Sequence, residues 1–172
     1  DLENIEAKRM EKYSFDNDYV NYVAANRIEK QKDIGTMLQA FSLLLKKQMN
    51  SRLYILGNIV KQEYYEELKN ICKQLHIEDK VFWEGQQSNP FKYIAHCDCF
   101  VLSSIYEGLP NAMMEALYLG IPVAVTRSIP FISQVIKDGT NGYSVPVRNP
   151  EALSEAMFKA CAIEQSLRKS AH

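Results

Sequence analysis

Short apolar runs alternate with amphipathic segments along most of this chain, and this alternation limits the folds it can adopt. The apolar runs predict buried strands at residues 21–25, 52–57, 80–85, 99–102, 122–125 and 142–145. Apolar residues at helical spacing predict helices near 33–45, 65–75, 90–95, 111–119 and 131–136, and a last helix that begins at Pro150. Strands that are apolar on both sides, with helices between them, are typical of a covered parallel sheet. The sequence therefore predicts an α/β fold with a parallel sheet flanked by helices.

The length and composition fit one globular domain. The 172 residues suffice for a full core, and 47% hydrophobic and 24% charged residues are ordinary proportions. Residues 1–18 are polar and mixed, so we expect a linker or edge segment there and a binding domain over 19–172. The chain begins in polar sequence without Met, which suggests a fragment of a longer protein.

Several function classes are disfavoured by what the sequence lacks. A net charge of −1 argues against a broad nucleic-acid surface, and no apolar run approaches the roughly 18 residues needed to span a bilayer. The four cysteines form no CxxC pair, so we expect reduced thiols packed in the core of a cytoplasmic protein. The segment Asp16-Asn17-Asp18 resembles a metal–diphosphate motif but precedes the first strand, so we expect a turn and no metal site.

The loops that follow the predicted strands are the places to look for a ligand, because such folds bind ligands beyond the carboxyl ends of their strands. The loop after residue 25 carries Arg27, Lys30 and Lys32. Arg can hold a phosphate through two N–H groups, and Lys adds a point charge. A solvated loop that only precedes a helix is the alternative for this segment.

Glu107 and Glu115 are the most informative acidic pair. Glu107 lies in a loop broken by Gly108 and Pro110, and Glu115 lies one turn into the apolar helix that follows. Glu is seldom buried without a partner, so a carboxylate in this apolar stretch favours a ligand or an ion pair over plain solvation. The helix start adds free N–H groups and a positive dipole end. One segment could thus hold both hydroxyls and phosphates, as a nucleotide sugar requires.

With these residues in place, the chain resembles the C-terminal, donor-binding half of a retaining GT-B glycosyltransferase. The similarity covers roughly residues 19–165 and points to the group called glycosyl transferases group 1 (family 4). Its strongest element runs from Glu107 to Glu115 and on to Gly120-Ile121-Pro122-Val123. A second element is Asn26-Arg27-Ile28, followed by Lys32-Asp33. The resemblance implies a Rossmann-like fold.

The resemblance also implies roles for these residues. Arg27 and Lys32 would hold the donor diphosphate and stabilise the leaving nucleotide, Glu107 would contact the donor sugar, and Glu115 would accept hydrogen bonds from the ribose. Backbone N–H groups of Asn111 and Ala112 would meet the sugar or phosphate. The remaining binding positions it implies are Gly57, Glu84, Gln86 and Leu109, with the turn at residues 84–86 against the base.

The same resemblance implies the ligands and partners. The donor would be a nucleotide-diphosphate sugar, with UDP the commonest carrier and GDP or ADP open, and no metal or other cofactor is expected. The acceptor would be a saccharide or glycolipid. Most of the acceptor site would lie in an N-terminal GT-B domain that this chain lacks, so the isolated chain would bind the donor without turnover. Association of the full-length protein with the inner membrane face is common in this group.

Five residues depart from the family pattern. Pro110 stands where many members have glycine, and it removes one possible N–H donor. Asn26 and Asp33 stand where the basic motif has glycines, so we expect a differently shaped phosphate loop. Phe131 stands at a glycine and Gln134 at the acid of a segment that lines the sugar pocket, which leaves the sugar open. The departures at Phe131 and Gln134 suggest one alternative, a nucleotide-sugar-binding module without transfer activity. A GT-B-like sugar epimerase is a further alternative, although the Arg/Lys and Glu107–Glu115 motifs fit the retaining transferases better.

Overall fold

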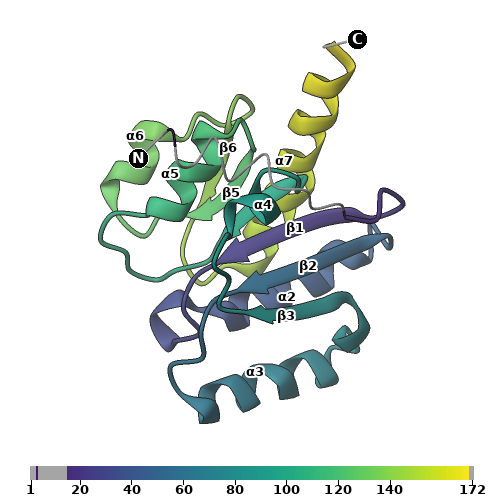
Figure 1. The fold of residues 1–172 in the computed structure, drawn as a ribbon, viewed down its shortest axis with the longest axis vertical. Coiled ribbons are helices and arrows are strands. Elements are labelled where there is room, and N and C mark those ends of the chain that lie inside the picture. Colours follow the sequence, from purple (N-terminus) through teal and green to yellow (C-terminus); the bar gives the residue numbers. More distant parts are fainter. Residues whose placement is uncertain (1–2, 4–14, 171–172) are drawn as a thin grey trace.

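The computed structural model describes Glu3 and residues 15–170, with strands and helices in alternation (Figure 1). The strands are β1 (Val20–Ala25), β2 (Ser51–Leu56), β3 (Val81–Gly85), β4 (Cys99–Leu102), β5 (Val123–Thr126) and β6 (Gly142–Val145). The helices are α2 (Ile34–Leu45), α3 (Gln62–Gln74), α4 (Phe91–Ile94), α5 (Asn111–Tyr118), α6 (Pro130–Val135) and α7 (Pro150–Ser170). Two short 3₁₀ helices are η1 (Lys30–Lys32) and η2 (Glu78–Lys80). Most of the predicted linker at 1–18 lies outside the described residues.

The six strands form one parallel sheet in the order β3-β2-β1-β4-β5-β6. The chain moves outward from β1 to β3 and then crosses back to place β4 on the other side of β1. The direction of winding therefore reverses between β1 and β4. In open α/β sheets, ligands bind beyond the carboxyl ends of the strands at such a reversal. The predicted parallel sheet is confirmed, and its order singles out the loops after β1 and β4.

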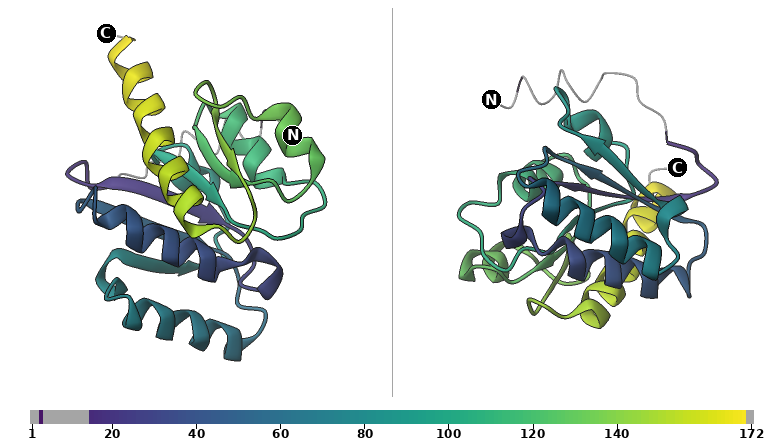
Figure 2. Two further views of the ribbon diagram at one scale, coloured as in Figure 1. Left: turned by 180° about the vertical axis from the view of Figure 1, so that it is seen from behind. Right: turned by 90° about the horizontal axis from the view of Figure 1, so that it is seen from below.

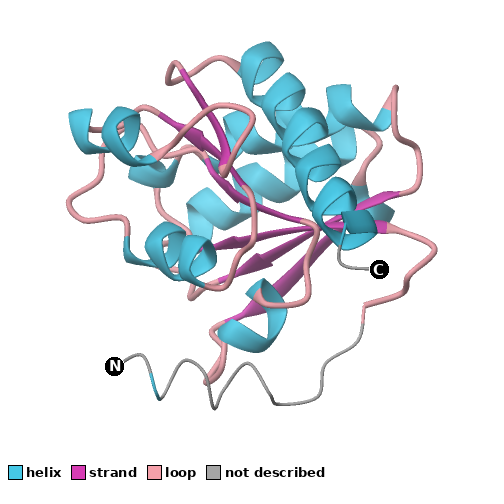
Figure 3. Cartoon of the chain, turned by 90° about the horizontal axis from the view of Figure 1, so that it is seen from above, coloured by secondary structure: helices cyan, strands magenta, loops and turns pink. Residues whose placement is uncertain are grey.

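Alternate residues of each central strand enter two separate cores. Tyr22 and Ala24 of β1 pack with the apolar faces of α2, α3 and α7, whereas Val23 packs with α4, α5 and α6. Figures 2 and 3 show the sheet between these two sets of helices. This two-residue alternation is the geometry of a pleated strand, and it explains why the strands read as continuously apolar. All four cysteines are buried and none forms a disulfide within the described residues, as predicted for core thiols.

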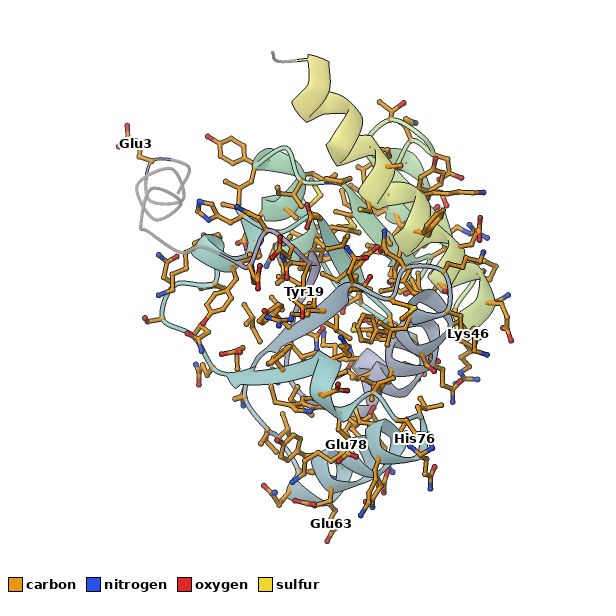
Figure 4. The ribbon with its side chains drawn as sticks, turned by 90° about the vertical axis from the view of Figure 1, so that its right-hand side faces the viewer. Glu3, Tyr19, Lys46, Glu63, His76 and Glu78 are labelled. Carbon is orange, nitrogen blue, oxygen red and sulfur yellow. The ribbon has the colours of Figure 1, made fainter. Side chains whose placement is uncertain are left out.

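The helix α3 begins earlier than the sequence pattern suggests. Its first residues, Gln62 and Glu63, are exposed and polar, so they give no apolar signal. Figure 4 shows Glu63 pointing away from the body of the protein. An acid in the first turn is favoured by the positive end of the helix dipole, which compensates for the missing apolar contact. Among the helices of the described residues, none is long and apolar enough to cross a membrane.

Candidate functional site

The loops after β1 and β4 are bound to each other at the carboxyl edge of the sheet. Ser103 donates its hydroxyl to the carbonyl oxygen of Lys32 at 2.8 Å, and the N–H of Ile105 donates to the carbonyl oxygen of Gln31 at 3.0 Å. Gln31 in turn donates its side-chain amide to the carbonyl oxygen of Tyr106 at 3.0 Å. Segments that lie far apart in the sequence therefore form one fixed wall, because β1 and β4 are neighbours in the sheet.

Lys32 and Glu107 form a buried ion pair in this wall. Lys32 Nζ lies 2.8 Å from Glu107 Oε1, and the two side chains are only 12% and 9% exposed. The hydroxyl of Ser104 donates to the same Oε1 at 2.5 Å. Glu107 Oε2 accepts no hydrogen bond from any residue that the structure describes. The burial of Glu107 is thus balanced by a charged partner and a hydroxyl, as buried carboxylates require.

Arg27 occupies a more open position. Its side chain is 61% exposed, and its Nη2 lies 3.0 Å from Oε1 of Glu29. An ion pair this exposed contributes little to stability. Arg27 nevertheless borders both cavities described next, so most of its guanidinium donors remain available to an anion.

Two adjoining cavities, each of about 220 Å³, lie at this edge of the sheet. They share a wall made of Ala25, Asn26, Arg27 and Ala112. The first cavity is further lined by Leu56, Gly57, Asn58, Gln86, Gln87, Pro90, Ile94 and Glu115. The second is further lined by Lys32, Leu102, Glu107, Leu109, Pro110, Asn111 and Met113. The fold therefore gathers most of the predicted site residues, and adds Asn58 and Gln87, which gave no motif signal.

The N-terminus of α5 faces these cavities with free backbone donors. Pro110 bends the chain so that the N–H of Asn111 donates to the carbonyl oxygen of Leu109 at 2.9 Å. The next intrahelical donor is Met114, whose N–H bonds to the carbonyl oxygen of Pro110 at 3.1 Å. Within the described part of the chain, the N–H groups of Ala112 and Met113 bond to no acceptor. The free donors are thus Ala112, as predicted, and Met113, while the predicted donor Asn111 is already engaged.

Glu115 is half-buried at the first cavity and has no ion-pair or hydrogen-bond partner among the described residues. Burial raises the pKa of its carboxyl group above the ordinary value. A carboxylate that loses hydration without gaining a partner is placed to accept hydrogen bonds from a ligand. The sequence left a ligand and an ion pair open for Glu115, and the described residues supply no ion pair.

Gly57 brings the ends of β1 and β2 into direct backbone contact. Its φ is +140°, and a Cβ added there would lie 1.7 Å from the carbonyl oxygen of Asn26. Its N–H donates to the carbonyl oxygen of Gly85 at 2.8 Å, which fixes the loop after β3 as well. Glu84 was also predicted as a binding residue, but it borders neither cavity. Its carbonyl oxygen accepts a hydrogen bond from the side-chain amide of Gln87.

The departures from the family pattern have separate outcomes. Asp33 adopts φ 45° and ψ 50°, the left-handed conformation that glycine favours and that Asp tolerates. Asp33 stands at the N-cap of α2, but its carboxylate accepts a hydrogen bond from the hydroxyl of Thr36 at 2.7 Å and none from a backbone N–H. Phe131 and Gln134 lie on α6 and border neither cavity.

A larger hollow of about 340 Å³ lies beside the site, between η1 and α3. Its charged side chains are of both signs, and Lys30, Lys61, Glu63 and Glu67 are exposed to solvent. This hollow lacks the convergent free donors of α5, so we place the site at the two smaller cavities.

Asp16 accepts the N–H of Asp18 on its Oδ1 at 3.0 Å, which confirms the predicted turn. Within the described ranges, no three His, Cys, Asp or Glu side chains gather as metal ligands.

Comparison with known proteins identifies the family of the chain. The model of the family described as glycosyl transferases group 1 matches residues 6–171. The chain is 36% identical over 105 residues, 61% of its length, to an uncharacterized glycosyltransferase of Methanocaldococcus jannaschii. It is 29% identical over 170 residues, 99% of its length, to N-acetylgalactosamine-N,N'-diacetylbacillosaminyl-diphospho-undecaprenol 4-alpha-N-acetylgalactosaminyltransferase of Campylobacter jejuni. It covers 25% and 44% of these two relatives, so it spans less than half of their length.

Solved structures agree with the expected fold. TarM of S. aureus superposes with a TM-score of 0.77 at 20% identity, over 91% of this chain and 32% of TarM. Anabaena HepE, in complex with UDP and glucose, superposes with a TM-score of 0.75 at 16% identity, over 89% of this chain and 44% of HepE. At these identities the likeness concerns the fold, and it confirms the Rossmann-like half of a GT-B architecture.

Proposed function

Because this chain belongs to the glycosyl transferases group 1 family, we propose that it is the donor-binding domain of a retaining glycosyltransferase. It binds a nucleotide-diphosphate sugar and presents it to a saccharide or lipid-linked acceptor. One observation carries the proposal. Two cations, two acids and the free N–H groups of α5 border two adjoining cavities at the point where the sheet reverses its winding.

Each part of the donor has a matching part of the site. The diphosphate lies between Arg27, Lys32 and the N-terminus of α5, where positive charge and N–H donors converge. The transferred sugar lies in the second cavity beside Glu107. The ribose lies in the first cavity beside Glu115, and the base lies toward Gln86.

Transfer by this site is electrostatic. As the bond between the anomeric carbon and the diphosphate breaks, negative charge grows on the leaving nucleotide. Arg27, Lys32 and the N–H groups of α5 stabilise that charge from fixed positions, so they need little reorganisation during the reaction. These groups supply the positive charge that a metal ion would otherwise provide, so we propose transfer without a metal or other cofactor.

UDP is the carrier that we propose. The HepE structures in the comparison contain UDP and UDP-glucose, and TarM was solved with UDP. In the first cavity, Asn58, Gln86 and Gln87 offer polar groups for a base beside Gly57.

A second domain completes the enzyme in this proposal. Ile59, Val60, Tyr106 and Leu109 are large apolar side chains, exposed by 41–64%, on the loops after β2 and β4 at the edge that carries the site. Exposed apolar residues gathered at one edge are typical of a surface that meets a partner. An N-terminal acceptor-binding domain would cover them, so the isolated chain binds the donor without transferring its sugar. The full-length protein would act in the cytoplasm, at the inner membrane face where its acceptor is a lipid.

Nucleotide binding tests the proposal directly on this chain. Thermal melting would be followed with UDP, GDP and ADP, all at the same concentration, so that the size of the shift ranks their affinities. A ligand at about 100 times its dissociation constant adds about 2.7 kcal/mol of stability. For a domain of this size that corresponds to roughly 5–10 °C in melting temperature. We expect UDP to give the largest shift.

Two arginine variants make the test specific. Arg27→Ala should abolish most of the shift, whereas Arg148→Ala should keep it, because Arg148 is exposed and borders neither cavity. The absence of any nucleotide shift in the wild-type chain would contradict donor binding by this domain. In the full-length protein, unchanged transfer after Glu107→Gln would contradict the role given to Glu107. Transfer by the isolated chain at the full-length rate would contradict the need for a second domain.

A further inference from the structure

Ser104 is a fully buried residue in the loop after β4, two residues beyond the strand, and the proposed donor contacts leave it unexplained. Its hydroxyl lies 2.5 Å from Oε1 of Glu107. An ionised carboxylate oxygen can only accept, so the serine must be the donor. The separation falls in the range of charge-assisted O–H···O⁻ bonds, which are stronger than neutral ones.

Ser104 is itself held by the neighbouring strand. Thr126, the last residue of β5, donates its hydroxyl to the carbonyl oxygen of Ser104 at 2.6 Å. Both residues are completely buried. Ser104 lies in the loop two residues beyond β4, and this bond fixes its backbone to the end of β5. The fixed backbone makes its hydroxyl a precise support for a side chain of the site.

This support fixes the orientation of the Glu107 carboxylate and leaves one of its two oxygens free at the second cavity. Ser104 and Lys32 both bind Oε1, so that oxygen is occupied. Oε2 takes no hydrogen bond from a residue within the described ranges, and Glu107 lines the cavity. The terminal torsion of a Glu side chain is soft and roughly two-fold. Without the serine, Lys32 alone would hold the carboxylate, and its orientation would become less defined.

We propose that Ser104 is a positioning residue that fixes Glu107 so that Oε2 alone meets a hydroxyl of the donor sugar. This inference rests on the proposed function, in which Glu107 contacts the sugar and not the nucleotide. Ser104 touches neither. Its loss should therefore weaken the binding of a UDP-sugar while leaving the binding of UDP itself almost unchanged. A serine that served only the stability of the fold would not distinguish these two ligands.

The test compares the affinity of UDP with that of a sugar conjugate by isothermal titration calorimetry. The conjugate is UDP-glucose or UDP-N-acetylgalactosamine, whichever the wild-type chain binds more tightly. We expect Ser104→Ala to lower the affinity for the conjugate about tenfold, equivalent to about 1.4 kcal/mol. The affinity for UDP should change by less than about twofold. Ser104→Thr keeps a hydroxyl at the position and should restore most of the lost affinity.

The neighbouring serine provides the matched control. The hydroxyl of Ser103 donates to the backbone oxygens of Lys32 and Asp33 and not to Glu107. Ser103→Ala should therefore change the affinities for both ligands by the same factor. If Ser104→Ala fails to fold, Thr126→Val replaces it, because that variant leaves the serine carbonyl without its donor and should weaken the conjugate selectively.

The outcomes separate the inference from the proposed function. Equal weakening of UDP and the conjugate, or no weakening of either, would overturn the positioning role while donor binding stands. If the wild-type chain binds no uridine nucleotide, the proposed function fails and this inference fails with it.

Discussion

Replacing Gly57 with alanine is a sharp test of how the site is built. The glycine lies at the end of β2, where its lack of a side chain lets the backbone of Asn26 pass directly against it. A Cβ at this position would lie 1.7 Å from the carbonyl oxygen of Asn26 and 2.6 Å from its carbonyl carbon. Both neighbours are backbone atoms at the end of β1, so neither can rotate away. Gly57→Ala must therefore displace the first residues of the loop after β1, which carries Arg27 and Lys32.

The expected loss of stability has two parts. An alanine at a φ of +140° is strained by roughly 1–3 kcal/mol, because a Cβ disfavours that backbone region. Overpacking against atoms that must shift adds roughly 1–3 kcal/mol. We therefore expect a loss of about 4 kcal/mol, or about 10 °C in melting temperature for a domain of this size. UDP binding should fall more than stability alone explains, because Asn26 and Arg27 border both cavities.

Two other glycines separate strain from overlap. Gly85 has a φ of +69° but nothing within 4 Å of an added Cβ, so Gly85→Ala should cost only about 1 kcal/mol. Gly35 lies inside α2, where an added Cβ would meet only Ile71 Cδ1 at 3.7 Å. Gly35→Ala should therefore stabilise the chain by up to about 1 kcal/mol through helix propensity. The melting temperatures measured by calorimetry should increase in the order Gly57→Ala, Gly85→Ala, wild type, Gly35→Ala. Similar melting temperatures for the Gly57 and Gly85 variants would refute the overlap argument.

Three further predictions concern the charged residues of the site. Burial raises the pKa of Glu115, so its ionised form costs stability once the pH rises through that raised pKa. Glu115→Gln should therefore have a higher melting temperature than the ligand-free wild type at pH 7, and the difference should disappear at acidic pH. A difference in melting temperature that does not depend on pH would contradict this. Lys32→Met should lower the free energy of unfolding in urea by about 3 kcal/mol, because it leaves Glu107 without its cation. Adding Glu107→Gln should recover most of that loss. No recovery would show that the ion pair is not the cause. Raising NaCl to about 0.5 M, where screening acts over roughly 4 Å, should weaken UDP binding less in Arg27→Ala than in wild type, because Arg27 is the more exposed cation. Equal salt dependence in titrations of the two proteins would contradict that role.

The elements of the fold could be predicted because their signals are local. The strand at Cys99–Leu102 is a run of apolar residues, and α7 begins at Pro150, a residue whose fixed φ suits a first helical position. The 3₁₀ helix η1 and the early start of α3 gave no such signal, because their residues are polar and exposed. Asn58 and Gln87 were missed for a similar reason, since they became cavity residues only through the loops that Gly57 holds together.

The sequence by itself determined which chemical groups the candidate site offers, since Arg27, Lys32, Glu107 and Glu115 stand in recognisable spacings beside predicted strands and a helix start. It left the partner of each group undefined. Lys32 and Glu107 are 75 positions apart, and they form a buried ion pair because the sheet places β4 directly beside β1. That order arises from the way helices pack on both faces of the whole sheet, which no local pattern encodes. Tertiary structure alone therefore decided that Ser104 supports Glu107, and that Glu115 is left without an ion-pair partner among the described residues.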